Sequence, residues 1–172
     1  PRLSPSVNAA PARRHEDGAF IAPEPKKGYR WTLRPSLLSG FRQSLDNGIV
    51  TIRFDGKSDP NYRHAYATIA AEPNTHYRVS ARIRTVNIAG GKVGISVGSS
   101  RGWKHNYYQS NAIDVSGTTN GWLTVSADYY TGADSHDFRI TARRVSGHGN
   151  LSGTVYFGDI TVQEFGPGMG PV

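Results

Sequence analysis

Aromatic and polar side chains are concentrated in one short segment of the chain, WKHNYYQ at residues 103–109. Trp103, His105, Tyr107 and Gln109 occupy every second position, and alternate positions of an extended strand lie on one face. An aromatic ring packs on the apolar C–H face of a pyranose, while planar polar groups form hydrogen bonds with neighbouring hydroxyls. This spacing therefore predicts a surface that binds a sugar.

Three further runs carry residues that suit the same kind of surface. HAYATIAA (64–71), GKVGISVGS (91–99) and DFRITARRV (137–145) each alternate apolar and polar residues, as strands with one buried face do. Small residues on a central strand leave a trough, and basic side chains beside it favour a uronic acid or a sulfated sugar. The additional ligand-binding candidates are His64, Tyr66, Lys92, Arg139 and Arg143.

A purely structural interpretation of the first segment stays open. GWKHNYYQSN also fits an ordinary edge strand followed by a solvent-exposed loop. A one-residue bulge would place Tyr108 rather than Tyr107 on the exposed face, so the assignment of individual residues depends on a regular strand.

Residue patterns typical of catalysis and of transition-metal sites do not stand out in the sequence. There is no evident acid pair, catalytic triad or phosphate-binding loop, and the chain has no cysteine. The six histidines show neither i, i+4 spacing nor an HExxH motif. HNYYQSN resembles the tyrosine-containing strand of jelly-roll alginate lyases, but their companion arginine-glutamate and glutamine-histidine strands are missing. We therefore expect a protein that is not an enzyme, with a polysaccharide lyase as the weaker alternative.

Composition points to a turn-rich β protein with anionic partners. The 172 residues include 20 glycines and 10 prolines, and the formal net charge is +7. A basic protein associates with anions, but no block of five or six like charges marks a nucleic-acid tail. No apolar run reaches the roughly 18–20 residues of a membrane span. We expect neither nucleic-acid binding nor membrane insertion.

The elements that would position these residues are short strands, and no segment has the pattern of a helix. Turn sequences such as DNG (46–48), AGG (89–91) and SGTTNG (116–121) separate them. Regularly spaced short strands are typical of an antiparallel sandwich or barrel. The predicted strands are 29–34, 48–54, 64–71, 75–86, 91–99, 103–109, 121–130, 137–145 and 153–165.

The ends of the chain differ from this pattern. Residues 1–28 hold five of the ten prolines and lack periodicity, which predicts an extended arm or linker. An arm that docks on neighbouring subunits is the alternative. The sandwich is expected over residues 29–166, followed by a flexible tail at 167–172.

Three segments resemble the core of carbohydrate-binding modules of families 4, 9 and 22, in the galactose-binding-like jelly-roll superfamily. They are YATIAAEPNTHYRVSARIRT (66–85), SNAIDVSGTTNGW (110–122) and RITARRVSGHGNLSGTVYFGDITV (139–162). The resemblance implies an all-β fold, an antiparallel β-sandwich of the jelly-roll type with two four- to five-stranded sheets. It also implies non-catalytic binding of polysaccharide in a concave cleft, with Trp122 as a buried framework residue.

A jelly roll fixes the order of the strands in each sheet. One sheet would hold 48–54, 154–165, 75–86 and 122–130, and the other 64–71, 137–145, 91–99 and 103–109. The candidate ligand-binding residues then share the exposed face of the second sheet. Arg78, Arg82 and Arg84 of HYRVSARIRT would lie on the opposite sheet, where we expect them to serve solubility rather than specific binding.

The resemblance also implies a structural calcium ion, for which Asp159 is the candidate ligand. Gly158 stands where the family often has a second acid. A strand bend at Gly158 that Asp159 caps is the alternative interpretation.

We expect an extracellular or surface-exposed protein, including the surface of a virion, with a polysaccharide or a cell-surface glycan as its partner. The main alternative is a structural jelly roll, such as a virion decoration, tail or adhesion protein, that docks on neighbouring subunits through residues 1–28.

Overall fold

The computed structural model describes residues 13–14, 20–100, 110–111 and 114–167, and within these ranges all regular structure is β-strand. This confirms the predicted all-β fold. It also follows that no described helix could span a membrane. The strands are β1 (Arg13–Arg14), β2 (Phe20–Ile21), β3 (Lys26–Tyr29), β4 (Thr32–Leu33), β5 (Phe41–Asp46), β6 (Ile49–Asp55), β7 (Ala65–Ala70), β8 (Thr75–Gly98), β9 (Ser110–Asn111), β10 (Val115–Gly117), β11 (Leu123–Tyr130), β12 (Asp137–Arg143) and β13 (Ser152–Pro167).

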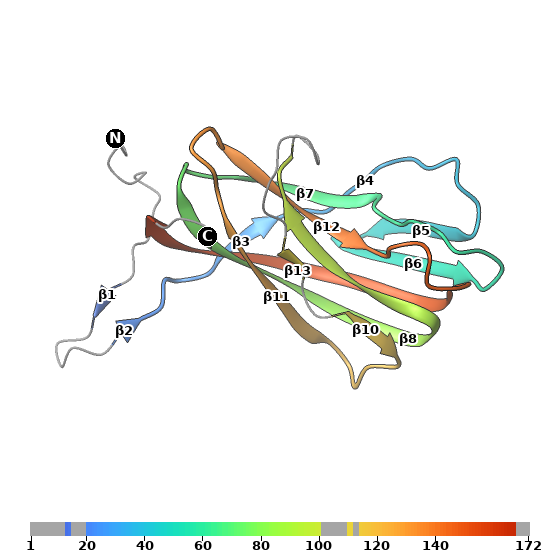
Figure 1. The fold of residues 1–172 in the computed structure, drawn as a ribbon. Coiled ribbons are helices and arrows are strands. Elements are labelled where there is room, and N and C mark those ends of the chain that lie inside the picture. The colour runs from blue at the N-terminus through green and yellow to red at the C-terminus, as the bar shows by residue number, and fades with distance from the viewer. Residues whose placement is uncertain (1–12, 15–19, 101–109, 112–113, 168–172) are drawn as a thin grey trace.

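Two antiparallel sheets face each other and are joined through β8 into one continuous 11-stranded sheet, apart from which β1 pairs with β2 (Figure 1). The first sheet has the order β5–β6–β13–β8–β11, and β3 joins β13 beyond the last pair that β13 forms with β6. The second sheet has the order β4–β7–β12–β8–β9. The predicted neighbours are confirmed throughout the first sheet and for the three runs 64–71, 137–145 and 91–99 of the second. The fourth predicted strand of that sheet, 103–109, lies outside the described residues.

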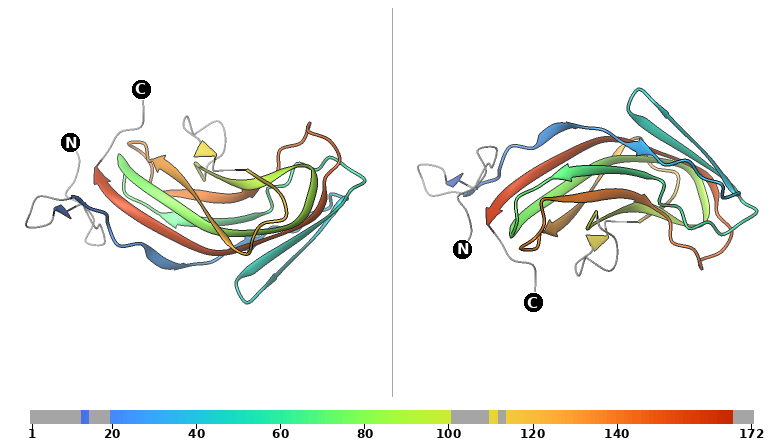
Figure 2. Two further views of the ribbon diagram at one scale, coloured as in Figure 1. Left: turned by 90° about the horizontal axis from the view of Figure 1, so that it is seen from below. Right: turned by 90° about the horizontal axis from the view of Figure 1, so that it is seen from above.

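The sandwich is curved, with β13 along its convex side and β12 along its concave side (Figure 2). Apolar side chains at alternate positions fill the space between the sheets, as the period of two requires. On β8 these are Tyr77, Val79, Ala81 and Ile83, each no more than 1% exposed. The outer face of the second sheet is therefore a concave surface lined by the other half of each strand.

The structure of β8 differs from the prediction at one strand boundary. The sequence predicted two strands separated by a turn at AGG (89–91). The chain instead bends without interruption, so the first half of β8 lies in the first sheet and the second half in the second sheet. The bend needs left-handed backbone, with φ of +55° at Asn87 and +84° at Gly90. A side chain on Gly90 would collide with the carbonyl oxygen of Asn150, so glycine is the only residue that fits.

Residues 29–34 also differ from the prediction of one strand. Tyr29 pairs with Ile160 in the first sheet, whereas Thr32 pairs with Tyr66 in the second. Trp31 lies between them with 3% exposure, and its Nε1 donates a hydrogen bond to the carbonyl of Gly158 over 2.8 Å. The ring thus closes the side of the core where the chain changes sheets.

Three other features of the sequence are placed by the structure. The DNG turn is confirmed, since Asn47 and Gly48 have positive φ and join β5 to β6. Strand β5 itself was missed, because FRQSLD lacks clear alternation. Strand β3 begins at Lys26, before the predicted boundary at 28/29.

Trp122 is not a core residue, contrary to the prediction. It is half-buried on the outer face of the first sheet, where the Arg82 guanidinium lies 5.1 Å from the centre of the tryptophan ring. Its position has the same parity as Thr124 and Ser126, which are exposed. The turn that precedes β11 therefore sends the tryptophan outward.

Candidate functional site

The outer face of the second sheet brings together most of the described candidate residues. Thr141 on β12 pairs with Tyr66 on β7 and with Ser96 on β8. One step along, Arg139 pairs with Thr68 and Gly98, and Arg143 pairs with Gly94 in the other direction. Gly94 and Ser96 on β8 are buried, while Tyr66, Arg139 and Arg143 on the neighbouring strands are partly exposed. We call this outer surface of the second sheet, which lies on the inner side of the curve in Figure 2, the concave face.

Tyr66 holds two arginines on the concave face. The guanidinium carbon of Arg139 lies 4.3 Å from the centre of the tyrosine ring, and that of Arg34 lies 5.2 Å from it. They come from the two sides of β7, because Arg139 is on β12 and Arg34 follows β4. A cation over an aromatic face is attracted by the ring quadrupole. Tyr66 therefore serves to orient guanidinium groups, which limits its own ring as a platform for a sugar.

One nitrogen of this arrangement, Nε of Arg139, is buried and unpaired among the described residues. A buried donor without a partner costs free energy.

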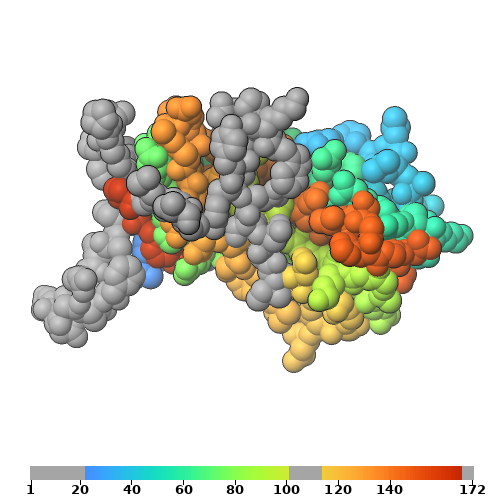
Figure 3. Space-filling model, viewed as in Figure 1, coloured from blue at the N-terminus to red at the C-terminus, as the bar shows by residue number. Residues whose placement is uncertain are grey.

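Lys92 and Arg143 both line a hollow of about 380 Å³ at one end of the concave face. It is also lined by Asp114, Arg144 and His148. In Figure 3 the orange-red loop 144–150 lies beside the yellow-green part of β8 at this end of the molecule. One Nη of Arg143 donates to Oδ1 of Asn61 over 3.2 Å. Burial lowers the pKa of the Arg143 guanidinium, and the charge of Arg63 lowers it further.

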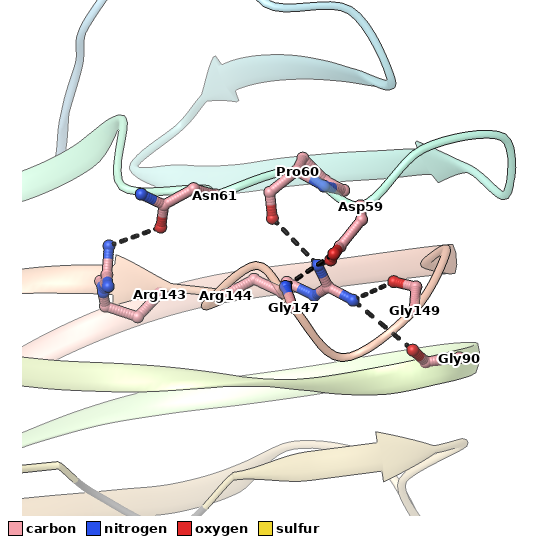
Figure 4. A network of polar contacts seen from close by, with 8 residues as sticks. All are labelled: Asp59, Pro60, Asn61, Gly90, Arg143, Arg144, Gly147 and Gly149. Atoms are coloured by element: carbon pink, nitrogen blue, oxygen red, sulfur yellow. Dashed lines mark hydrogen bonds and ion pairs between the residues drawn. The ribbon is translucent and has the colours of Figure 1, made fainter.

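Arg144 positions this hollow, and the sequence reasoning did not single it out. Its side chain is 2% exposed and donates to the carboxylate of Asp59 and to the carbonyl groups of Pro60, Gly90 and Gly149. Figure 4 shows the guanidinium among these groups, while neighbouring Arg143 points the other way, toward Asn61. The arginine therefore ties two loops to the bend of β8.

Asp59 completes that network. Its hydrogen bond from Arg144 lowers the pKa of the carboxyl group, and the backbone N–H of Gly147, 2.6 Å from Oδ2, lowers it further. The carboxylate thus stays ionised and holds the loop that borders the hollow.

His64 was expected on the exposed face, and this placement is wrong. The residue is 8% exposed, with its ring centre 5.3 Å from that of Phe41 and 5.2 Å from that of Tyr62. Burial lowers the pKa of its imidazole, and Arg34 and Arg63 lower it further. The reason is a local irregularity: Tyr62 pairs with Arg144 but Tyr66 pairs with Thr141, so four steps on one strand oppose three on the other.

The remaining candidates of this face, Trp103, His105, Tyr107 and Gln109, lie outside the described residues. The chain that follows them is placed: Asn111 of β9 pairs with Ser96, and Ser110 pairs with Val97.

Asp159 lies far from this face, on the outer side of the first sheet. Its carboxylate is 81% exposed and is 3.8 Å from the Arg82 guanidinium. Within the described residues, no three acidic or histidine side chains gather closely enough to share an ion. These surroundings fit an exposed ion pair better than a set of calcium ligands.

Comparison with known proteins identifies the fold. No family model matches the chain, and no curated protein matches it in sequence. Among solved structures, a family 4 carbohydrate-binding module superimposes with a TM-score of 0.53 at 19% identity, over 78% of this chain and 86% of that one. An arabinose-bound GH51 α-L-arabinofuranosidase gives a TM-score of 0.50 at 15% identity, over 78% of this chain but only 23% of the enzyme. The chain has the jelly-roll fold of carbohydrate-binding modules.

Proposed function

We propose that this chain, with the jelly-roll fold of carbohydrate-binding modules, binds a polysaccharide or glycan on its concave face without catalysing a reaction. The observation that carries the proposal is the set of polar side chains that β7 and β12 place on one face. Thr68 and Thr141 contribute hydroxyl groups, and the guanidinium groups of Arg139 and Arg143 lie on the same face. Saccharides are recognised by such planar hydrogen-bonding groups.

The charges of the concave face favour an acidic glycan. Arg34, Arg139, Arg143 and Lys92 contribute cations, and guanidinium groups suit a carboxylate or sulfate oxygen. Asp114, which lines the hollow beside Lys92, is an opposing charge at its edge. Guanidinium groups recognise carboxylates through paired N–H donors, so uronic acids are the ligands that this face supports best.

Binding is tested by affinity electrophoresis in gels that contain polygalacturonate, alginate or a neutral xylan, at low and at moderate salt. We expect retardation by the uronates, weakened by salt because screening reduces attraction between exposed charges. The double variant Arg139→Ala, Arg143→Ala should lose retardation. Lys57→Ala, which removes an exposed lysine from the turn after β6, is the matched control. Migration that no polysaccharide changes would contradict the proposal.

Three further expectations stay predictions, each with a direct test. Docking on neighbouring subunits through residues 1–28 predicts that the protein elutes from a sizing column as a stable assembly. Proteolysis of the arm should dissociate this assembly. Calcium at Asp159 predicts a heat of binding on titration with calcium chloride that Asp159→Asn removes. An extracellular or surface location predicts that the protein is accessible to antibody on intact cells or particles.

A further inference from the structure

A second hollow, of about 910 Å³, lies on the outer face of the first sheet, on the opposite side of the sandwich from the concave face. We call it the convex groove. Ser80 of β8, Thr124 of β11 and Thr161 of β13 contribute hydroxyl groups to it, and Lys27 and Arg30 stand at its β3 side. Its volume lies within the range of small-molecule sites.

The convex groove results from an irregularity in β13. Phe157 pairs with Ile83 and Ile160 pairs with Ala81, so β13 has an extra residue between these pairs and bulges at Gly158 and Asp159. At the same point β13 stops pairing with β6 and starts pairing with β3. The partner strand therefore changes beside the bulge, and the first sheet is open there.

Two tryptophans hold the bulge in place. Nε1 of Trp31 donates to the carbonyl of Gly158 from the core side. On the outer side, a Cβ added to Gly158 would lie 3.3 Å from the ring of Trp122. The tryptophan thus covers the glycine and in turn supports the Arg82 guanidinium, 5.1 Å from its ring centre. These contacts place Arg82 beside the groove.

The chemistry of the convex groove suits an acidic saccharide. Lys27, Arg30 and Arg82 are exposed and line the groove, against one carboxylate, Asp159. Hydroxyl groups across neighbouring strands supply both donors and acceptors, and Oγ of Ser80 lies 2.7 Å from Oγ of Ser126. Cations near a hydroxyl-rich floor match a carboxylated sugar, whose acid group pairs with the cations while its hydroxyls meet the floor.

From this arrangement we infer that the convex groove is a second binding site, for short oligosaccharides that carry carboxylate groups. Lys27, Arg30 and Arg82 bind the carboxylates, and Ser80, Thr124 and Thr161 bind sugar hydroxyls. The site is independent of the concave face, because it uses the other sheet and none of the same residues. A chain with both sites would bind two acidic segments at once, on opposite sides of the sandwich.

Calorimetric titration with a galacturonate trimer tests the inference, with a neutral galactose trimer as the matched ligand. In a background of Arg139→Ala, Arg143→Ala, which disables the concave face, the galacturonate trimer should still bind with one site per chain. Adding Lys27→Ala and Arg30→Ala should weaken this binding about tenfold or more, because charge-assisted hydrogen bonds are lost. Adding Lys57→Ala instead should leave it unchanged.

The outcomes separate the two sites. If the concave-face variant binds no galacturonate but wild type does, the convex groove is not a saccharide site and the proposed function stands. If Lys57→Ala weakens binding as much as the groove variant does, general attraction by positive charge explains the data and the inference fails. Equal or tighter binding of a short single-stranded DNA to the groove would also overturn it. Lys27 and Arg30 are exposed, so unchanged thermal unfolding is expected and is checked for each variant.

Discussion

The guanidinium of Arg139 lies over the ring of Tyr66, with 4.3 Å between its central carbon and the ring centre, and its buried Nε has no hydrogen-bond partner among the residues that the structure describes. The tyrosine holds the arginine in place before any ligand arrives, so less conformational freedom is lost on binding. The concave face is in this sense prepared for an oxygen-rich anion.

Removing the ring of Tyr66 should therefore weaken binding. We expect Tyr66→Ala to lower the affinity for oligogalacturonate by about threefold or more, as a cation–π contact at a partly exposed site contributes about 0.5–1 kcal/mol or more. Tyr66→Phe keeps the ring and should stay close to wild type. Calorimetric titration of both variants checks this. Equal affinities for Tyr66→Ala and wild type would show that the ring does not prepare Arg139.

Arg144 should be essential for stability. Arg144→Ala leaves the carboxylate of Asp59 and three carbonyl groups without their donor and removes a side chain that is 2% exposed, so it should lower the free energy of unfolding far more than a surface truncation does. Arg143→Ala is the matched control, since the next residue along the chain points to the outer face, and it should cost about 1 kcal/mol or less. Urea unfolding measures both. Similar losses for the two variants would contradict the buried role of Arg144.

The stability of the protein should fall in mild acid through His64. Its folded-state pKa is lowered, so the unfolded chain binds a proton more readily, and the contribution is fully present only above the ordinary pKa of about 6.5. It declines as the pH falls through that value toward the folded-state pKa. Urea unfolding between about pH 5 and about pH 8 should show this slope in wild type. His64→Phe, which keeps a ring between Phe41 and Tyr62, should have a smaller slope; an equal slope would assign the effect to other groups.

Trp31 and Trp122 should differ in how much each contributes to the free energy of unfolding. Trp31→Ala removes a ring that is 3% exposed and should lower the free energy of unfolding by about 3–5 kcal/mol. Trp122→Ala removes a half-buried ring and should cost about 1–2 kcal/mol, through lost packing and lost contact with Arg82. Denaturant unfolding compares them. An equal loss for Trp122→Ala would restore its predicted place in the core.

Strand periodicity explains which residues could be predicted from the sequence. Tyr66, Arg139 and Arg143 lie on the concave face because β7 and β12 alternate without interruption from these residues onward. The same alternation of inward and outward residues also indicates the correct positions of Arg144 and Trp122. Arg144 follows the inward series of Phe138, Ile140 and Ala142, and Trp122 precedes the outward series of Thr124 and Ser126.

Other features could not be read from local patterns. The bulge that buries His64 depends on the pairing of Tyr62 with Arg144, two residues far apart in sequence. The bend of β8 looks like a turn in the sequence because its backbone needs Gly90. Only the close approach of Gly90 to Asn150, which is seen in the fold, distinguishes a bent strand from a turn between two strands. To predict the convex groove, one would have to know that β3 replaces β6 as the neighbour of β13. Each of these is a long-range relationship.

The central claim is that an acidic glycan binds on the concave face, and amide chemical shifts of ¹⁵N-labelled protein test it most directly. Titration with a galacturonate trimer should shift the amides of residues 66–68, 94–98 and 139–143 in a saturable way. The neutral galactose trimer should shift them less, and Arg139→Ala should reduce the response to the galacturonate trimer. Unchanged shifts at all three segments with saturating galacturonate would contradict the claim, whatever is observed elsewhere in the chain.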